Sequence, residues 1–434
     1  MKNTSSLPNR RTWLAALTPR KSWVRAHLIA TVMTVALAAG AQEPFPSTGD
    51  SKVPKEASET KELTTLTPLV EELRWLKAEK VMITTVSKRL EDPFRSAAAV
   101  SVITSDEIRR SGARSIPEAL RLAPGLSVAS MDANKWAISS RGFNNRFADK
   151  LLILIDGRSV YTPTMSGVFW DVQDYLLEDI DRIEVVHGPG GTLWGANAVN
   201  GVINIITKHS ANTTGSYFTG GYGTEHQGFG SFRYGTQVKE DVFARGYFKY
   251  RNHDEGQGGS DGWDMMQGGF RTDWYLNDVA ELMVKADVYY ASLSHLQPLP
   301  QIVPGASPFP SPAHLAIPII RETYDDFGAN LIARYEREYS EDSELVIQAY
   351  FDRTDRSELY FDSARDTYDL DIQHRVSLPY NQNLMYGVEY RYFPDYYRTT
   401  RFPRPSPSIQ RRADGRRSAD FFRTIFSCSK ITSG

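Results

Sequence analysis

Residues 183–208, which read IEVVHGPGGTLWGANAVNGVINIITK, decide how the rest of the chain is interpreted. The stretch opens and closes with apolar, β-branched runs that favour β-strands. Its centre is rich in Gly, Pro and Asn, which favour turns. A glycine-rich loop after a strand can cradle phosphate, but that site requires a helix next, and the spacing here is not GxGxxG. We therefore rank a nucleotide-dependent enzyme as the weakest interpretation.

Two further motifs precede this stretch in the sequence. They are Arg141-Gly142-Phe143 and residues 152–160, which read LILIDGRSV. Together with residues 183–208 they resemble the plug domain of TonB-dependent outer-membrane receptors, in the branch of colicin I, cobalamin and ferric-siderophore receptors. The resemblance is dense over residues 81–208 and weaker to about residue 397. The matching motif positions are Gly142, Phe143, Asp156, Gly157, Gly188, Pro189, Gly195, Asn200 and Gly201.

The resemblance implies active import of a scarce ligand, such as a ferric siderophore or cobalamin, by a receptor whose plug sits inside a barrel. The implied partners are the energised inner-membrane protein TonB, that ligand and outer-membrane lipid. It implies a mixed α/β plug domain followed by an antiparallel transmembrane β-barrel. The expected segments are a signal peptide at 1–41, a linker at 42–79, a TonB-box-like segment at 80–89, the plug at 92–208, a partial barrel at 215–400 and an aberrant tail at 401–434.

From residue 215 onward, apolar and polar side chains alternate with a period of two. This pattern is typical of a barrel wall that faces lipid, and equally of a half-buried sheet in a soluble protein. Short turns that alternate with long loops favour the barrel, and residues 294–324 form the longest expected loop. A soluble periplasmic binding or interaction protein remains the alternative, and outer-membrane fractionation distinguishes the two.

The predicted barrel has too few strands to close. We count about nine strands between residues 215 and 397, whereas plugged transporters close with about 22. The alternation is lost at about residue 401, where the sequence becomes rich in Arg, Ser and Pro. We therefore expect a truncated barrel, and a frameshift or premature end is our hypothesis for the tail.

The amino terminus predicts export. Basic residues from Arg10 to Arg25 precede an apolar run at 28–39, and Ala39-Gly40-Ala41 resembles a signal-peptidase site. The formal net charge is −2 and no polybasic run is present, so we expect no nucleic-acid partner. The single cysteine, Cys428, rules out a disulfide within the chain. The predicted location is the outer membrane.

Local signals place several elements within the plug. Residues 100–103 and 152–155 read as strands, and Asp156-Gly157 as a tight turn. Ser105 is the predicted N-cap of a helix that begins at Asp106. Ser115 is the predicted start of a second helix, with Pro117 early in it.

Residues 80–89, KVMITTVSKR, lie where the family carries its TonB box, a segment that adds as a strand to TonB. Strand addition draws its affinity from backbone hydrogen bonds, so a β-prone and unpaired segment suits it. The alternative is that the segment is the first strand of the plug. The candidate residues are Val81, Met82, Ile83, Thr84, Thr85 and Val86.

Arg141 and His187 are candidates for contacts between plug and barrel. In the family, the arginine of the R-G-F motif and a second arginine just before G-P form salt bridges with glutamates of the barrel wall. Arg141 matches the first position, but the second is His187, and a neutral imidazole cannot replace a guanidinium. An ordinary surface arginine is the alternative for Arg141.

No enzyme, metal or cofactor site is predicted. The eight histidines lack ligand spacing, and Asp156, Asp171 and Glu184 are interpreted as turn or structural groups. Trp170 and Trp194 are interpreted as plug core or plug–barrel contacts. Loops 144–149 and 162–167 are the plug segments expected to meet the ligand.

Overall fold

The structure is a computed structural model, and it describes two amino-terminal fragments and most of the chain after them. The described residues are 83–85, 96 and 98–430, with gaps at 143, 149, 257–258, 299–300, 304–313, 317–318, 341, 359–361, 381 and 399–414. The expected signal peptide and linker lie outside them. Among the described residues, no helix is both long enough and apolar enough to cross a membrane.

Residues 98–213, which we call the amino-terminal domain, contain a five-stranded sheet in the order β1-β6-β7-β4-β5. Its neighbours are antiparallel except for β4 and β7, which are parallel. Its strands are β1 (Ala99–Thr104), β4 (Leu151–Ile155), β5 (Arg158–Ser159), β6 (Ile180–His187) and β7 (Gly201–Thr207). The other elements are α3 (Ser105–Ser111), α4 (Ile116–Leu120), the hairpin of β2 (Leu126–Ser130) and β3 (Trp136–Ser140), η2 (Trp170–Val172), η3 (Leu177–Asp179), α5 (Gly191–Trp194) and η4 (Ser210–Thr213). Every residue of β4 is buried, so this apolar strand lies in the domain core.

The helix signals are confirmed, with one shift of a residue. Helix α3 begins at Ser105 and is capped by Thr104, not by Ser105 as predicted. The Thr104 hydroxyl accepts from the Glu107 N–H (3.3 Å), and the Glu107 carboxylate accepts from the Thr104 N–H (2.7 Å). This reciprocal capping box satisfies two backbone donors and fixes the start one residue earlier. Ser115, the predicted start of the second helix, is the N-cap of α4, which begins at Ile116.

The stretch at 183–208 forms β6, a turn-rich loop and β7, as the sequence predicts. The loop also contains α5, a single helical turn that the sequence pattern did not indicate. The Gly190 N–H donates to the Ala198 carbonyl (2.8 Å), which closes the loop around this turn.

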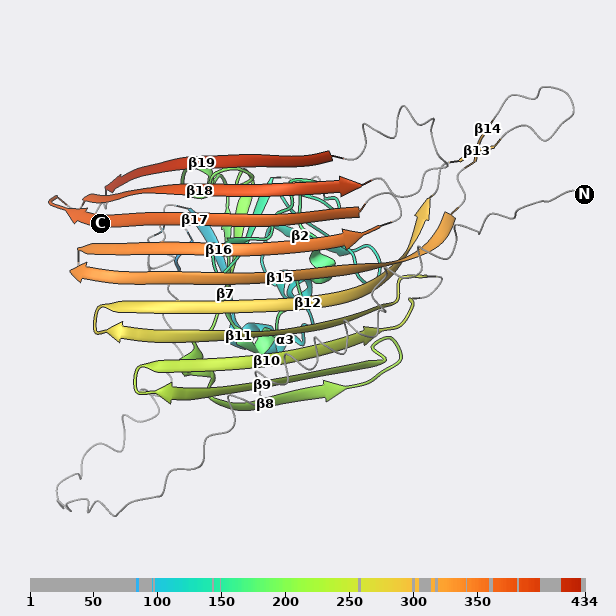
Figure 1. Cartoon of the computed structure of the whole chain (residues 1–434), viewed down its shortest axis with the longest axis horizontal. Helices are drawn as coiled ribbons and strands as arrows, with labels where there is room; N and C mark the ends of the chain where they lie inside the picture. The colour runs from blue at the N-terminus through green and yellow to red at the C-terminus, as the bar shows by residue number, and fades with distance from the viewer. Residues whose placement is uncertain are drawn as a thin grey trace, which may run out of the picture. The chain divides into compact units, whose positions relative to one another are not determined.

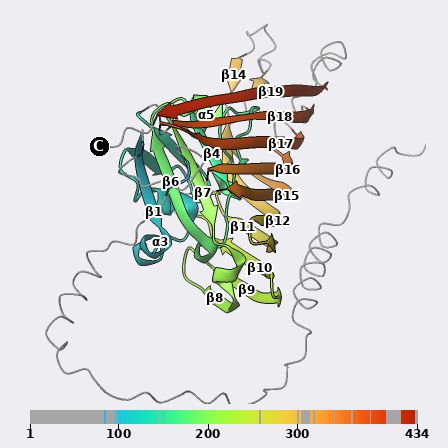
Figure 2. The ribbon, with the colours of Figure 1, turned by 90° about the vertical axis from the view of Figure 1, so that its left-hand side faces the viewer.

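The second part of the structure is a ten-stranded antiparallel sheet, which we call the wall (Figure 1). This architecture confirms the predicted mixed α/β domain followed by an antiparallel sheet. The described strands run in the order β19-β18-β17-β16-β15-β12-β11-β10-β9-β8, so β8 and β19 are its edges. They are β8 (Gly215–Gly221), β9 (Gly228–Lys239), β10 (Val242–His253), β11 (Trp263–Asn277), β12 (Ala280–Pro298), β15 (Ile319–Ser340), β16 (Ser343–Ser357), β17 (Asp362–Leu378), β18 (Gln382–Arg398) and β19 (Gly415–Lys430). Figure 2 shows the labelled strands of both sheets after a quarter turn.

Two segments of the wall differ from the expectation. The long loop predicted at 294–324 is shorter, because β12 and β15 stay paired out to Pro298 and Ile319. A small pair, β13 (Gln301–Val303) with β14 (His314–Ala316), lies between them. Within residues 401–434, where the alternating pattern is lost, β19 pairs with β18 along its whole length. Backbone pairing does not require alternation, which explains why the pattern missed this strand.

The wall carries its polar and apolar faces in an unusual arrangement. Along β15, the polar residues Asp326 and Asn330 are buried at 2% and 7% exposure, whereas Leu331 is 46% exposed. Large apolar or aromatic side chains are also exposed on other strands of the wall: Phe270, Tyr368, Leu370 and Tyr390. The face that contacts the amino-terminal domain therefore carries many buried polar and charged side chains beside an apolar cluster around Met265 and Leu293, and the opposite face exposes apolar side chains.

Candidate functional site at the interface of domain and wall

Buried ion pairs join acidic residues of the amino-terminal domain to basic residues of the wall. Asp174 accepts from Lys249 (2.9 Å) and Arg251 (2.8 Å), both on β10. Burial alone would raise the pKa of Asp174, but these two cations reverse the effect and leave its pKa lowered. Asp179 forms a second such pair with Arg233 (2.6 Å) on β9.

The Asp156-Gly157 turn between β4 and β5 contacts the wall directly. Both residues have positive φ, 49° and 81°, as expected for a tight hairpin turn. The Asp156 carboxylate accepts from Lys285 Nζ (2.8 Å) and from the Thr207 N–H (2.8 Å). Burial opposes its ionisation, but Lys285 and Arg271 outweigh burial and hold the pKa of Asp156 well below its usual range.

A side chain at Gly157 would press on the ends of two side chains of the wall. A Cβ built there would lie 2.7 Å from both Arg334 Nη2 and Gln348 Oε1. Arg334 Nη2 also donates to the Asp156 carbonyl (3.1 Å). The turn is therefore fitted to the wall by both its backbone angle and its missing side chain.

Arg356 on β16 is the centre of a second contact. Its guanidinium lies over the rings of Phe169 (3.9 Å) and Tyr324 (4.8 Å). It also donates to Asp171 (2.6 Å) in the domain and to Asp326 (2.7 Å) in the wall. Burial would raise the pKa of Asp171, but Arg356 more than compensates, so its pKa is lowered. Arginine suits this position because its planar guanidinium can stack on aromatic rings and donate hydrogen bonds to two carboxylates at the same time.

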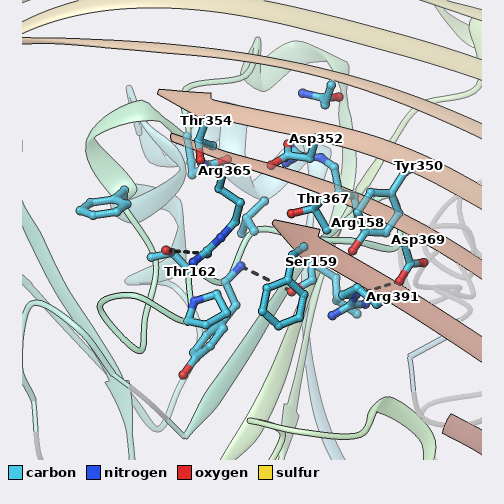
Figure 3. Close-up of a pocket in the computed structure, with 18 of the residues that line it drawn as sticks. Arg158, Ser159, Thr162, Tyr350, Asp352, Thr354, Arg365, Thr367, Asp369 and Arg391 are labelled. Carbon is cyan, nitrogen blue, oxygen red and sulfur yellow. Dashed lines mark hydrogen bonds and ion pairs between the residues drawn. The ribbon is translucent and has the colours of Figure 1, made fainter. Parts of the chain in front are cut away.

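The wall also holds the loop at 162–167, one of the two plug loops expected to meet a ligand. Arg365 on β17 donates to the hydroxyls of Thr162 (2.9 Å) and Thr164 (2.7 Å). The same guanidinium is ion-paired with Asp395 on β18. Figure 3 shows Arg365 beside Thr162 at the edge of a cavity between domain and wall.

The described part of the TonB-box candidate, residues 83–85, is bound to the domain. Ile83 and Thr85 are fully buried. The Glu184 carboxylate accepts from the backbone N–H groups of Thr84 (2.9 Å) and Thr85 (2.7 Å). The Thr85 carbonyl accepts from the Trp194 indole N–H (2.7 Å). Val81, Met82 and Val86 lie outside the described residues.

Glu184 and Trp194, which the sequence indicated only as structural residues, both hold residues 84–85. Glu184 is completely buried, and Arg182 Nε is 2.8 Å from its carboxylate. Asn204 on β7 donates to the Thr85 hydroxyl (3.1 Å). We call Glu184, Trp194 and Asn204 the clasp, because each of them holds residues 84–85.

Arg141 and His187 lie near one another but do not form the contacts that the family resemblance implied. Arg141 is exposed and has a φ of 63°. In the described part of the chain, it forms no ion pair with a carboxylate of the wall. His187 contacts Ser101 (2.9 Å), and partial burial together with the nearby Arg141 lowers the pKa of His187. The ion pairs that do join domain and wall involve other residues.

The remaining motif residues shape the loop between β6 and β7 and its surroundings. Gly188 and Gly195 have positive φ, 131° and 73°. A Cβ on Gly201 would lie 2.6 Å from the Val186 carbonyl oxygen. Asn200 donates to the Ser140 carbonyl (3.3 Å), and Pro189 lies next to Gly188 in the loop. Gly142 has a φ of 89°, and Phe143 lies outside the described residues.

In the part of the chain that the structure describes, one group of side chains has the spacing of metal ligands: His209, Asp273 and Glu281. His209 Nδ1 accepts from the Ala211 N–H (3.1 Å), and Nε2 lies 3.0 Å from Glu281. A metal ion on Nε2 would require the ring proton on Nδ1, where the Ala211 N–H already donates. The hydrogen bonding does not fit a metal site.

Sequence reasoning missed the ion pairs between domain and wall because each partner lies on a different part of the chain. Asp156 and Asp171 were noticed only as separate carboxylates. The wall does contain a signal for these ion pairs, because Lys249, Arg251 and Lys285 occupy polar positions on β10 and β12. Buried basic side chains on one face of a sheet require acidic partners on the element packed against that face, because an unpaired buried charge is costly.

Comparisons with known proteins agree with this architecture. Residues 92–202 match the family model described as the TonB-dependent receptor plug domain. The vitamin B12 transporter BtuB of Vibrio vulnificus (strain CMCP6) is 31% identical over 166 residues, which are 37% of this chain and 26% of that protein. An iron-regulated outer membrane virulence protein of Vibrio cholerae serotype O1 (strain ATCC 39541 / Classical Ogawa 395 / O395) is 33% identical over 138 residues, 30% of this chain and 20% of that protein.

Solved structures share the fold of this chain over about three quarters of its length, which is more than the amino-terminal domain alone. The siderophore receptor PirA of Pseudomonas aeruginosa matches with a TM-score of 0.53 and 18% identity, over 76% of this chain and 52% of that chain. A mutant of the ferric enterobactin receptor PfeA, from the same organism, matches with a TM-score of 0.56 and 16% identity, over 75% and 54%. The chain thus spans about half the length of these receptors, and its matches cover about a quarter or less of the curated relatives.

Proposed function

We propose that this chain, whose residues 92–202 match the TonB-dependent receptor plug domain, is part of an outer-membrane receptor for energised import. In this proposal the amino-terminal domain is the plug and the wall is part of the surrounding barrel. The imported ligand is an iron chelate or a cobalamin, the two classes named for its relatives. In this proposal the protein binds the ligand and moves it without chemistry on it.

The single observation that carries this proposal is the polarity of the wall. Buried Asp326 and exposed Leu331 lie on the same strand, the reverse of a water-soluble sheet. An apolar outer face is stable against lipid and unfavourable against water. A soluble periplasmic protein would need the opposite arrangement.

The experiment places one charge on the outer face. Leu331→Arg should cost about 2–4 kcal/mol if that position lies near the middle of a bilayer. Leu122→Arg is the matched control, because Leu122 is 44% exposed on the amino-terminal domain. We expect only the first variant to disappear from the outer-membrane fraction of a cell that expresses a complete receptor carrying this domain and wall. Recovery of the unaltered receptor in the soluble periplasm would overturn the proposal.

We further propose that residues 83–85 belong to the segment that pairs with TonB. Strand addition uses backbone N–H groups, and Glu184 binds two of these in the present structure. Ile83→Pro removes a backbone donor and should reduce uptake, while ligand binding is retained. Uptake would be measured in a complete receptor that carries this segment, on defined iron and cobalamin sources. Unchanged uptake would place the TonB-binding segment elsewhere.

A further inference from the structure

Two histidines contact each other at one end of the wall. His226 lies in the loop between β8 and β9, and His253 is the last residue of β10. Strands β8 and β10 are each antiparallel to β9, so both end on the same rim of the wall (Figure 1). The Asp254 N–H donates to the Glu225 carbonyl (2.7 Å), which holds the loops after β8 and β10 together. Neither histidine takes part in the clasp or in the ion pairs described above.

The spacing of the two rings matches that of two imidazoles bound to one metal ion. Their centroids are 4.6 Å apart, and their planes are inclined by 78°. A metal–nitrogen bond of about 2.0–2.1 Å places each ring centroid about 3.2 Å from the ion. Two rings at about 90–109°, the angles of square-planar and tetrahedral ions, would then have centroids about 4.5–5.2 Å apart. The rings of His226 and His253 therefore already have the separation that a shared ion requires.

The hydrogen bonding of His253 leaves one ring nitrogen with a lone pair. His253 Nδ1 lies 2.8 Å from the Asp254 carbonyl oxygen, which can only accept. The neutral ring thus carries its proton on Nδ1 and keeps a lone pair on Nε2. A backbone carbonyl on the second nitrogen is a usual support of a histidine that binds a metal ion. In this respect His253 differs from His209, both of whose ring nitrogens are engaged.

The His226 ring is also available as a ligand. Among the residues that the structure describes, its nitrogens have no hydrogen-bond partner, and its contact is with the His253 ring. Partial burial, together with Arg251, lowers the pKa of His226 to about 4. The ring is therefore neutral at neutral pH, and a metal ion need not displace a proton from it.

Neighbouring groups hold the His253 ring and balance the nearby charge. Trp263 on β11 is the register partner of His253, and its ring lies parallel to the imidazole (7°, centroids 6.1 Å apart). The Trp263 indole N–H donates to the Ala133 carbonyl (3.1 Å). Arg251 lies over the Trp263 ring (5.2 Å) and is ion-paired with Asp174 (2.8 Å), so its charge is compensated. A ligand that is already held in place loses less freedom when it binds.

Two neutral imidazoles select transition-metal ions. Imidazole suits zinc, copper and nickel, and the affinity of nitrogen ligands for divalent ions of this series is highest for Cu²⁺. Mg²⁺ and Ca²⁺ require oxygen ligands instead. Among the described residues, no third histidine, cysteine or carboxylate converges with the pair. Water molecules would therefore occupy the remaining positions around the ion.

We propose that His226 and His253 form a binding site for a divalent transition-metal ion, with Cu²⁺ bound most tightly. The bound ion joins the β8–β9 loop to the end of β10. This site goes beyond the proposed import function, since it requires neither TonB nor the imported ligand.

The first test adds Cu²⁺ alone to the full 434-residue chain in detergent. Pulsed electron paramagnetic resonance detects the remote nitrogen of a copper-bound imidazole, and two bound imidazoles give combination signals that one does not give. We expect these combination signals when Cu²⁺ is present at less than the protein concentration. Zn²⁺ should compete for the site, and Mg²⁺ at the same concentration should not. A spectrum of the unaltered chain without the signals of two imidazoles would overturn the proposal.

Substitutions locate the ion. His226→Gln and His253→Gln should each abolish the combination signals and weaken Cu²⁺ binding by about tenfold, equivalent to about 1.4 kcal/mol. His374→Gln on β17 is the control and should change neither, because both ring nitrogens of His374 already have partners, Ser343 and Tyr386. Unchanged spectra and affinity in both rim variants would place the copper on other histidines and refute the assignment.

A second measurement follows the loop itself. Because the ion joins the β8–β9 loop to β10, Cu²⁺ should slow amide hydrogen exchange at residues 222–227 of the unaltered chain and leave it unchanged in His226→Gln. Equal slowing in the two proteins would contradict a role for this histidine. Failure of the copper site leaves the import proposal intact, because that proposal depends on the polarity of the wall and is tested by fractionation.

Discussion

Asp156 and Lys285 are 129 residues apart in the sequence, yet their side chains meet at 2.8 Å, and each is only 4% exposed. One lies in the turn between β4 and β5 and the other on β12. Asp156 also accepts from the Thr207 N–H, so the pair connects the centre of the amino-terminal domain to the wall. Removing either partner leaves a buried charge without its main counter-ion.

Lys285→Met should therefore destabilise the protein by about 3–5 kcal/mol, the usual cost of breaking a buried pair from one side. Urea unfolding followed by tryptophan fluorescence would measure it. The double variant Lys285→Met with Asp156→Asn should recover much of the loss, because no unpaired charge remains. Simple addition of the two single effects would show that the pair is not coupled.

Gly157→Ala should destabilise the protein although the added group is a single methyl. The φ of 81° disfavours alanine, and the methyl would lie 2.7 Å from Arg334 and Gln348. The positive φ alone costs about 1–2 kcal/mol, and displacing the ends of Arg334 and Gln348 adds to it, so we expect a larger loss than in the control below. Gly112→Ala on α3 is the matched control, with a φ of 72° and nothing within 4 Å of its Cβ. Equal losses in the two variants would show that the positive φ alone disfavours alanine at Gly157, and that the contacts with Arg334 and Gln348 add nothing.

Arg356→Lys should not preserve the contact with Asp171. A lysine keeps the charge but loses both the forked donor geometry and the stacking on Phe169 and Tyr324. We expect Phe169 and η2 to exchange amide hydrogens faster in this variant. Arg353→Lys is a suitable control, because Arg353 is 38% exposed on the same strand. Equal exchange rates in both variants would contradict a special role for Arg356.

Glu184→Gln should loosen residues 84–85. A neutral amide oxygen accepts less strongly than the carboxylate, and the arrangement of two backbone N–H groups on one charged group is lost. Hydrogen exchange at Thr84 and Thr85 should become faster, and the plug should unfold at nearly the same denaturant concentration if Arg182 turns to solvent. Glu178→Gln, on η3, is the control. Unaltered hydrogen-exchange protection of Thr84 and Thr85 would mean that Trp194 and Asn204 hold this segment without the Glu184 carboxylate.

Acid should weaken the interface at about pH 4 and below. Asp171 and Asp174 have lowered pKa values in the folded protein, through Arg356 and through Arg251 with Lys249. Such groups stabilise fully above their unfolded pKa of about 3.9, and the stabilisation is lost as the pH falls through the folded pKa. Urea midpoints should thus show no loss from these groups between pH 5 and 7. Asp174→Asn should flatten the acid slope, and a main transition above pH 5 would contradict this assignment.

Much of the fold could be predicted because its signals are local. The buried strand at 151–155, the Asp156-Gly157 turn and the Ser115 cap depend on residues close in sequence. The wall followed from strict alternation, and β19 was missed where alternation fails. The α5 turn was missed because a single helical turn has no periodicity to detect.

The candidate site was harder to predict because its contacts join distant segments. The family resemblance indicated Arg141, whereas the structure places the ion pairs at Asp156, Asp171 and Asp174. Glu184 looked like an ordinary strand residue until residues 84–85 were placed on it. Such pairings depend on the topology, which composition and spacing do not determine.

The bases on the polar face of the wall have a consequence for assembly. If one strand slipped by a single residue against its neighbour, each of its side chains would change face, because strand side chains alternate. Lys285 would then point to the apolar side and Asp156 would lose its partner. Under the proposed outer-membrane location, a lysine near the middle of the bilayer costs about 2–4 kcal/mol. The buried charges that attach the amino-terminal domain therefore also favour the correct strand register, because a shifted strand would no longer present its charges to that domain.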